Sequence, residues 1–299
     1  MQVDPNYIQS LVGSLNTATG NEAQLTNELS SGLGVTSLAS DPAAVGQSTL
    51  LSAAISRDDS YVQASATAQS QLQVTDSALG EVVSQLTSAL SVVVAGANGT
   101  QNATDQISTA NQLSAIRDQV LSLANTEYLG QYVFSGSDGS VQPFTQDTST
   151  TPDTTTYNGD TALQYTTTEN GQQIQTNLPG SSVFTAAGAN VFTALNQIVS
   201  DFSSGASNST LQFDTTQLST ALHGVVTQRS VLDNSLAQLE STSTYAQTSS
   251  TQLQAAQSTL ISADTASIAT QLSSTETQSQ ALMSSISTLE KNSLFDYLK

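Results

Sequence analysis

The sequence contains one histidine, the side chain most often used in general acid–base chemistry: His223 within LSTALHGVV. A catalytic triad requires a nucleophile and an orienting acid around the imidazole. The sequence contains no G-x-S-x-G elbow to supply that nucleophile. There is also no cysteine, which excludes thiolate catalysis, disulfides and cysteine-based metal sites. We therefore interpret His223 as a structural or solvent-facing residue of a helix.

Four aspartates lie in the loops of the middle of the chain: Asp138, Asp147, Asp153 and Asp160. The segment SGSDGS around Asp138 offers oxygen ligands of the kind that Ca²⁺ prefers. The D-x-[DN]-x-[DN]-G pattern is missing, so a role in turns is favoured for all four. A carboxylate pair could hydrolyse a glycoside, but the chain has no Trp for a sugar platform. We expect no enzyme activity, no catalytic residue, no bound metal and no cofactor.

The charge balance argues against two classes of partner. The chain of 299 residues carries 24 acidic and five basic residues, a net charge of -19. Nucleic-acid binding depends on clustered Lys and Arg, so we expect no nucleic acid partner. An anionic membrane surface is disfavoured for the same reason.

Targeting signals and membrane spans are not evident in the sequence. The N-terminal segment lacks the basic and apolar regions of a Sec signal peptide. No stretch approaches the roughly 20 apolar residues of a membrane span. Only 37% of the residues are apolar and 10% charged, which is low for a globular domain. This composition predicts an elongated or assembly-dependent chain.

The two ends of the chain show the same helical seam. Apolar residues recur at intervals of three and four or in heptads, which is typical of coiled-coil-like helices. An isolated helix with so little apolar surface is marginal in water, so we expect the two terminal helices to pair. The seam residues are Ile8, Leu11, Leu15, Leu25 and Leu29 in the first helix, ended by Gly32 and Gly34, and Ile268, Leu272, Leu282, Ile286 and Leu289 in a last helix that starts near Leu253.

Longer helices and a β-rich segment are predicted between these ends. Asp41 is expected to cap a helix of about 80 Å that runs from Pro42 to Ala95. Further helices are predicted from Ile107 to Tyr128, over NVFTALNQIVSDF, and over 213–257. Between Gln131 and Asn190 the chain alternates and is rich in Thr, and Asn170-Gly171 predicts a hairpin.

These elements predict a mainly α, elongated protein with a β-rich insert, whose long N- and C-terminal helices pair in an antiparallel coiled-coil-like bundle. We expect three domains. They are an inner helical domain of residues 1–40 with 256–299, a long-helix bundle of 41–135 with 213–255, and an outward-facing β-rich insert of 136–212.

The chain closes on NSLFDYLK, which is apolar where chain ends are usually polar. Leu294, Phe295, Tyr297 and Leu298 therefore predict that this end docks on another surface. Together with the ten seam residues of the terminal helices, they form the predicted assembly interface.

Three motifs resemble those of flagellin-type proteins. LSSGLGVTSLASDPAA, from Leu29 to Ala44, is similar to the helix-to-helix turn of that superfamily. YLGQYVFSGSDG, from Tyr128, followed by YNGD, from Tyr157, resembles the entry to the inserted domain of the hook-filament junction family, hook-associated protein 3. The closing SLFDYL is similar to the C-terminus of the same family. The order of these motifs covers both ends of the chain and the boundary of the insert.

The resemblance implies a secreted structural protein of the bacterial flagellum that forms a thin layer between hook and filament. In such a layer the terminal helices form the inner tube and the insert faces outward. Export by the flagellar type III apparatus would explain the missing Sec signal. The implied partners are copies of the chain in a ring layer, the neighbouring hook-associated protein and other axial proteins, and a flagellar export chaperone. Flagellin itself, or an exported adhesin or enzyme on a flagellin-like scaffold, remain alternatives.

Overall fold

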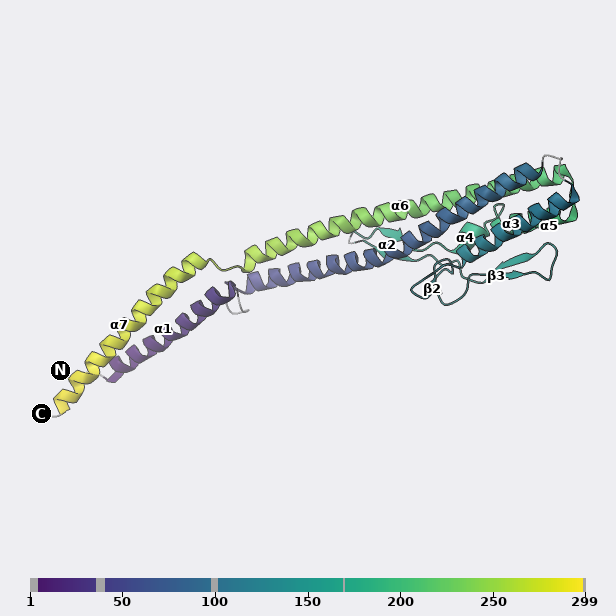
Figure 1. Cartoon of the computed structure of the whole chain (residues 1–299). Helices are drawn as coiled ribbons and strands as arrows, with labels where there is room; N and C mark the ends of the chain where they lie inside the picture. Colours follow the sequence, from purple (N-terminus) through teal and green to yellow (C-terminus); the bar gives the residue numbers. More distant parts are fainter. Residues whose placement is uncertain (1–4, 36–40, 98–101, 169, 298–299) are drawn as a thin grey trace. The chain divides into compact units, whose positions relative to one another are not determined.

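The computed structural model describes residues 5–35, 41–97, 102–168 and 170–297, which form mostly long helices with a few short strands (Figure 1). The helices are α1 (Pro5–Ser31), α2 (Pro42–Gly96), α3 (Ala103–Ala124), α4 (Gly180–Phe184), α5 (Val191–Ser204), α6 (Asn208–Ile261) and α7 (Thr265–Tyr297). The strands are β1 (Glu127–Tyr128), β2 (Gln131–Tyr132), β3 (Phe144–Asp147), β4 (Thr154–Tyr157), β5 (Tyr165–Thr167) and β6 (Gln173–Gln175).

The chain divides into two compact units. The terminal unit consists of residues 1–56 with 249–299, and the core unit of residues 57–248. Helices α2 and α6 contribute residues to both units. The finer division into three domains stays a prediction.

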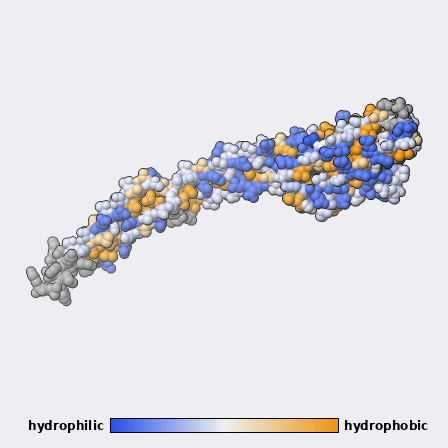
Figure 2. Space-filling model, viewed as in Figure 1, coloured by the Kyte–Doolittle hydropathy of each residue, from blue (hydrophilic) through white to orange (hydrophobic). Residues whose placement is uncertain are grey.

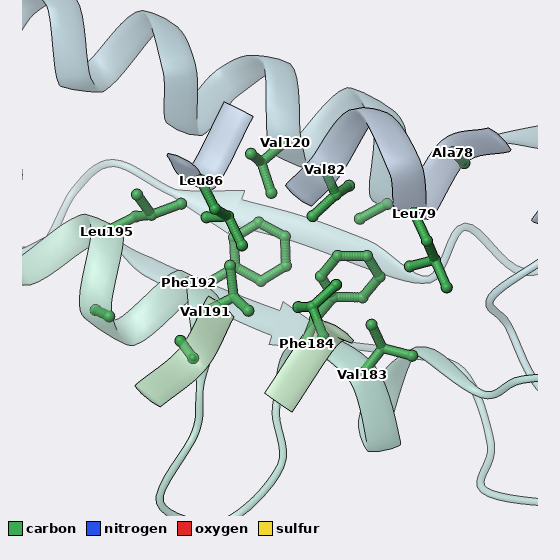
Figure 3. Close-up of a cluster of buried hydrophobic side chains, with 14 of the residues drawn as sticks. Ala78, Leu79, Val82, Leu86, Val120, Val183, Phe184, Val191, Phe192 and Leu195 are labelled. Atoms are coloured by element: carbon green, nitrogen blue, oxygen red, sulfur yellow. The ribbon is translucent and has the colours of Figure 1, made fainter. Parts of the chain in front are cut away.

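The core unit is built around five buried phenylalanines. Phe144 contacts the rings of Phe184 and Phe192 at centroid distances of 5.3 and 5.0 Å, and Phe134 meets Phe184 edge to face. Figure 3 shows Leu79, Val82 and Leu86 of α2 facing the phenylalanines of the insert. The heptad leucines of α2 therefore bury their side chains against the insert as well as against α6. Burial of large apolar and aromatic side chains of this kind stabilises a fold strongly.

Helix α2 runs without interruption through Gly46 and Gly80. It begins as predicted, because a side-chain oxygen of Asp41 accepts hydrogen bonds from the backbone N–H groups of Ala43 and Ala44, both at 3.0 Å. Among the described residues it is also the one helix long and apolar enough to cross a membrane by length and composition. That finding corrects the expectation that no stretch comes near such a span. Part of this apolar surface belongs to the core, including Leu79, Val82 and Leu86, whereas Leu50 and Val94 are 73% and 49% exposed.

The described residues form three antiparallel strand pairs: β1 with β2 just before the predicted insert, and β3 with β4 and β5 with β6 within it. The predicted hairpin lies between β5 and β6, where Gly171 takes a φ of +81°. Glycine adopts this left-handed conformation without strain. Helices α4 and α5 lie in the same segment, and α5 packs along α3.

Two predicted helix boundaries were wrong. Helix α3 ends at Ala124, and Tyr128 lies in β1, because the Asn125 side chain pairs with both the N–H and the C=O of Phe144 at 2.9 and 3.0 Å. The last helix starts at Thr265, so Leu253 belongs to α6. Asp264 caps α7 by accepting from the N–H groups of Ala266 and Ser267.

Candidate assembly surface of the terminal helices

Helices α1 and α7 lie side by side and run in opposite directions, so the start of α1 and the end of α7 lie at the same end of the pair (Figure 1). Their matching turns line a shared polar groove. It is lined by Asn21, Gln24 and Leu25 of α1 and by Gln271, Ser274 and Thr275 of α7. This register places the first turns of α1 beside the last turns of α7, and the end of α1 beside the start of α7.

The α1–α7 pair buries very little apolar surface. Among the side chains that the structure describes on these two helices, the buried ones are Ala18, Glu28, Ile268 and Ser279, of which two are polar. Apolar residues also remain at the surface: Tyr7 is 57% exposed and Met283 is 52% exposed. Figure 2 shows hydrophobic residues on the outside of this pair, scattered among hydrophilic ones. The described side chains of the terminal unit thus form no apolar core of the kind that the core unit has.

The hydroxyl groups of the pair mostly bond within their own helix. Thr17 and Thr26 of α1 donate to the backbone carbonyls of Gly13 and Glu22 four residues earlier. On α7, Thr275 donates in the same way to Gln271. Bonds of this pattern satisfy the hydroxyl without linking the helices. They add nothing to the packing of α1 on α7.

A short backbone bridge joins the segment that follows α1 to the segment between α6 and α7. Gly32, with a φ of +69°, follows α1, and Leu33 pairs antiparallel with Ser262. The N–H of Gly34 donates to the carbonyl of Ile261, and the N–H of Ala263 donates to that of Gly32, both at 2.9 Å. A Cβ at residue 34 would lie 3.3 Å from Ala263 Cα, so glycine permits this close approach.

The predicted seam residues lie on this pair, with graded burial. Ile268 is buried at 7% exposure, and Leu29 is the most exposed of the set at 38%. The others are half-buried: Ile8, Leu11, Leu15, Leu25, Leu272, Leu282, Ile286 and Leu289. Leu294, Phe295 and Tyr297 lie within α7, but their side chains are not described, and Leu298 falls outside the described residues. Whether these residues form an assembly interface stays a proposal.

Some surface residues of the pair were missed by the sequence reasoning. Tyr7, Val12 and Met283 are apolar and exposed outside the predicted seam. Glu28 is buried and accepts a hydrogen bond from Gln24 at 2.8 Å. The i, i+4 spacing of Gln24 and Glu28 was a usable signal. The exposed apolar residues carried no signal, because single apolar residues are common on any surface.

The candidate chemical residues take structural roles. His223 is exposed on α6. The carboxylates of Asp138 and Asp147 accept from the N–H and hydroxyl of the serine two residues on, which lowers the pKa of both, and this is the predicted turn role. Hydrogen bonds from Ser137 and the N–H of Ala162 likewise lower the pKa of Asp160.

Asp153 differs from this turn role. Its carboxylate pairs with the buried guanidinium of Arg117 at 2.6 Å and ties the residue before β4 to α3, so the expected turn role was wrong for this residue. No cluster of three or more acids or histidines that could hold a metal occurs within the described ranges.

Comparison with known proteins relates the chain to one family. Residues 6–138 match the bacterial flagellin N-terminal helical region. The chain is 33% identical over 143 residues to flagellar hook-associated protein 3 of Salmonella typhimurium, which covers 48% of this chain and 45% of that protein. The match thus spans less than half the length of the curated relative. These matches confirm the predicted resemblance to hook-associated protein 3 and to the flagellin N-terminal region.

Solved structures show the same fold. A flagellar hook-associated protein of Vibrio parahaemolyticus superposes with a TM-score of 0.64 at 18% identity, over 74% of this chain and 99% of the other. The flagellar junction protein FlgL of Legionella pneumophila gives a TM-score of 0.59 at 17% identity, over 73% and 100% of the two chains. The predicted fold class, mainly helical with paired terminal helices and a strand-containing insert, is confirmed.

Proposed function

We propose that this relative of hook-associated protein 3 is a structural axial protein of the bacterial flagellum, which forms a junction layer between hook and filament. The proposed mechanism couples folding to assembly. The core unit folds by itself, and the terminal helices become ordered only when neighbouring subunits cover them.

The observation that carries this proposal is the poor burial of the α1–α7 pair. Ordering the backbone of a residue costs about 1–2 kcal/mol, and burial returns about 25 cal/mol for each Å² of apolar surface. Ala18 and Ile268 are the apolar side chains buried on this pair among those described. The free energy gained from burying so little apolar surface does not offset the entropic cost of ordering two long helices. Neighbouring subunits that contact the exposed and half-buried apolar residues would supply the missing burial.

The proposed partners follow from this mechanism and from the relatives. They are further copies of the chain in a ring layer, the neighbouring hook-associated protein and other axial proteins, and an export chaperone that protects the apolar C-terminal segment before assembly. Helical head-to-tail contacts are heterologous and can extend without limit. A thin layer therefore requires subunits of a different kind above and below it. Secretion through the flagellar export apparatus is part of the same proposal.

Electron microscopy of a deletion strain tests the proposal. Cells without the gene should carry hooks without filaments and release flagellin into the medium. Reintroduction of the full chain should restore filaments. Filaments of normal length on the hooks of the deletion strain would contradict the proposed role.

A matched pair of truncations locates the function at the C-terminus. A chain that ends at Leu294 should be secreted with its core unit folded, but should not restore filaments. A chain that lacks only Lys299 is the control and should restore them. Normal motility with the shorter chain would remove the role proposed for the C-terminal segment.

Flagellin is the nearest alternative, since it shares the N-terminal helical family. The two roles differ in whether the subunit grows a filament alone. Purified protein should stay short or monomeric under conditions that polymerise flagellin. Growth of long filaments from the purified chain would favour the alternative.

An exported adhesin or enzyme would have to use the insert. A cleft of about 360 Å³ lies between the insert and α3, beside Arg117, Asn196 and Ser200. The Arg117 guanidinium already donates to Asp118, Asp153 and Ser114, so its charge is committed within the fold. We therefore propose a scaffold role for the insert and no enzyme activity. Specific ligand binding or turnover by the purified full chain would overturn this.

A further inference from the structure

We propose that Asp201 and Asp214, here called the carboxyl pair, share one proton and so form a pH-sensitive lock that holds α5 against α6 in the core unit. The lock is closed when the pair carries one negative charge and loosens when it carries two. This role is independent of the proposed place of the chain in the flagellum.

The pair sits where the chain turns back on itself. Asp201 lies in the last turn of α5, and Asp214 lies in the second turn of α6. Gly205, in the left-handed conformation at a φ of +72°, caps α5 between them. Across this short connection Asp201 is the neighbouring side chain that acts on Asp214, as a hydrogen-bond partner and as a charge.

Asp214 is buried. It is 3% exposed, and Leu211, three residues earlier on α6, is fully buried. Its Oδ2 atom has no hydrogen-bond donor among the described residues. A buried carboxylate without a donor is strongly disfavoured, whereas a protonated carboxyl can donate to a neighbouring carboxylate. The geometry thus favours a neutral Asp214.

Asp201 is the charged member of the pair. The side-chain amide of Gln197 donates to Asp201 Oδ2 at 2.9 Å, which stabilises a carboxylate at this position. With Asp201 ionised, a second negative charge beside it is repelled.

The other charged groups of the surrounding elements do not act on Asp214. On α5, Asp201 is the sole charged residue, and α2 carries none between Glu81 and its end at Gly96. On α3 the charged residues are Asp105, Arg117 and Asp118, and on α6 His223 and Arg229 come next in the chain. The causes that act on Asp214 are its burial and Asp201. Burial and the neighbouring carboxylate raise the pKa of Asp214 to about 7.

The direction of the pH effect follows from this. In the unfolded chain Asp214 loses its proton near pH 4, while in the folded chain it keeps the proton until about pH 7. The unfolded state therefore binds fewer protons than the folded state between these values. The pair's contribution to stability is full below about pH 4, falls as the pH rises, and is lost above about pH 7.

NMR titration of the full-length chain with ¹³C-labelled aspartate tests the shared proton. The Asp214 carboxyl resonance should titrate near pH 7 in the wild-type chain, and at a clearly lower pH in Asp201→Asn. A midpoint below pH 5 for Asp214 in the wild-type chain would overturn the proposal. So would an unchanged midpoint in Asp201→Asn.

Thermal unfolding gives a second, independent readout. The Tm of Asp214→Asn relative to wild type should rise by several degrees between pH 5 and pH 8. Glu240→Gln, at an exposed position of the same helix, is the control and should show no such trend. A parallel pH dependence of Asp214→Asn and wild type would contradict the lock.

Millimolar CaCl₂ at pH 8 should not raise the Tm of the wild type selectively over that of Asp214→Asn. If it did, the pair would be a cation site and the lock would be wrong.

Discussion

The guanidinium of Arg229 on α6 holds the carboxylate of Asp76 on α2 in two hydrogen bonds, of 2.6 Å from Nε and 3.1 Å from one terminal nitrogen. Gly80, one turn further along α2, lies beside this guanidinium, and a Cβ there would lie 3.5 Å from it, at ordinary contact distance. Arg229 and Asp76 are 153 residues apart in the sequence, so this ion pair connects two distant parts of the chain. It fixes the register of α2 against α6 in the core unit.

Arg229→Gln and Asp76→Asn should each lower the stability of the core unit by about 0.5–1 kcal/mol, because the two side chains are 37% and 26% exposed and partly screened. The double variant should lose less than the sum of the two. Urea unfolding of all three variants measures this coupling. Glu240→Gln serves as a control for a charge change on α6. If the loss in the double variant equalled the sum of the two single losses, the ion pair would not couple α2 to α6.

Phe144→Ala should destabilise the core unit by about 3–5 kcal/mol, because the ring is fully buried among other phenylalanines. Leu25→Ala in the half-buried seam of α1 should leave the same unfolding transition nearly unchanged. Chemical denaturation followed by near-UV circular dichroism makes the comparison. A similar loss in both variants would mean that the two units fold as one.

Gly34→Ala should weaken filament attachment, because the added Cβ would press on Ala263 Cα and on the carbonyl of Ser262, both at 3.3 Å. Gly20→Ala is the matched control. A Cβ there meets nothing within 4 Å, and alanine favours helix by about 1 kcal/mol over glycine. Swimming in soft agar should be reduced by the first substitution and preserved by the second. Equal motility of the two strains would speak against the bridge.

Mild proteolysis of the purified monomer should trim about the first 40 and last 40 residues, which lie in the poorly buried terminal unit, and leave the core unit intact. Mass spectrometry of the resistant fragment gives its ends. Cleavage that starts in the insert, while both chain ends survive, would not fit the assembly-coupled mechanism.

Helix positions and the faces they bury could be predicted well from this sequence. The heptads of α2 and the cap at Asp41 have local causes, so periodicity and residue type were sufficient. The family resemblance rested on short motifs at the chain ends and at Tyr128. These lie at helix ends and turns, where residue choice is most restricted.

What escaped prediction depends on contacts between distant residues. Nothing near Arg117 in the sequence indicates that Asp153, 36 residues away, will pair with it. The end of α3 depends on the bonds between Asn125 and Phe144. The carboxyl pair likewise forms only because the corner at Gly205 brings α5 and α6 together. The break before α7 had a local signal, since Asp264 is a typical capping residue.

Hydrogen–deuterium exchange of the free chain and of the chain assembled on isolated hooks tests the central claim most directly. In the free chain we expect the amides of α1 and α7 to exchange within seconds while those of α2, α3 and α5 stay protected. Assembly should protect α1 and α7 as well. Strong protection of α1 and α7 in the free monomer, unchanged by assembly, would contradict the claim.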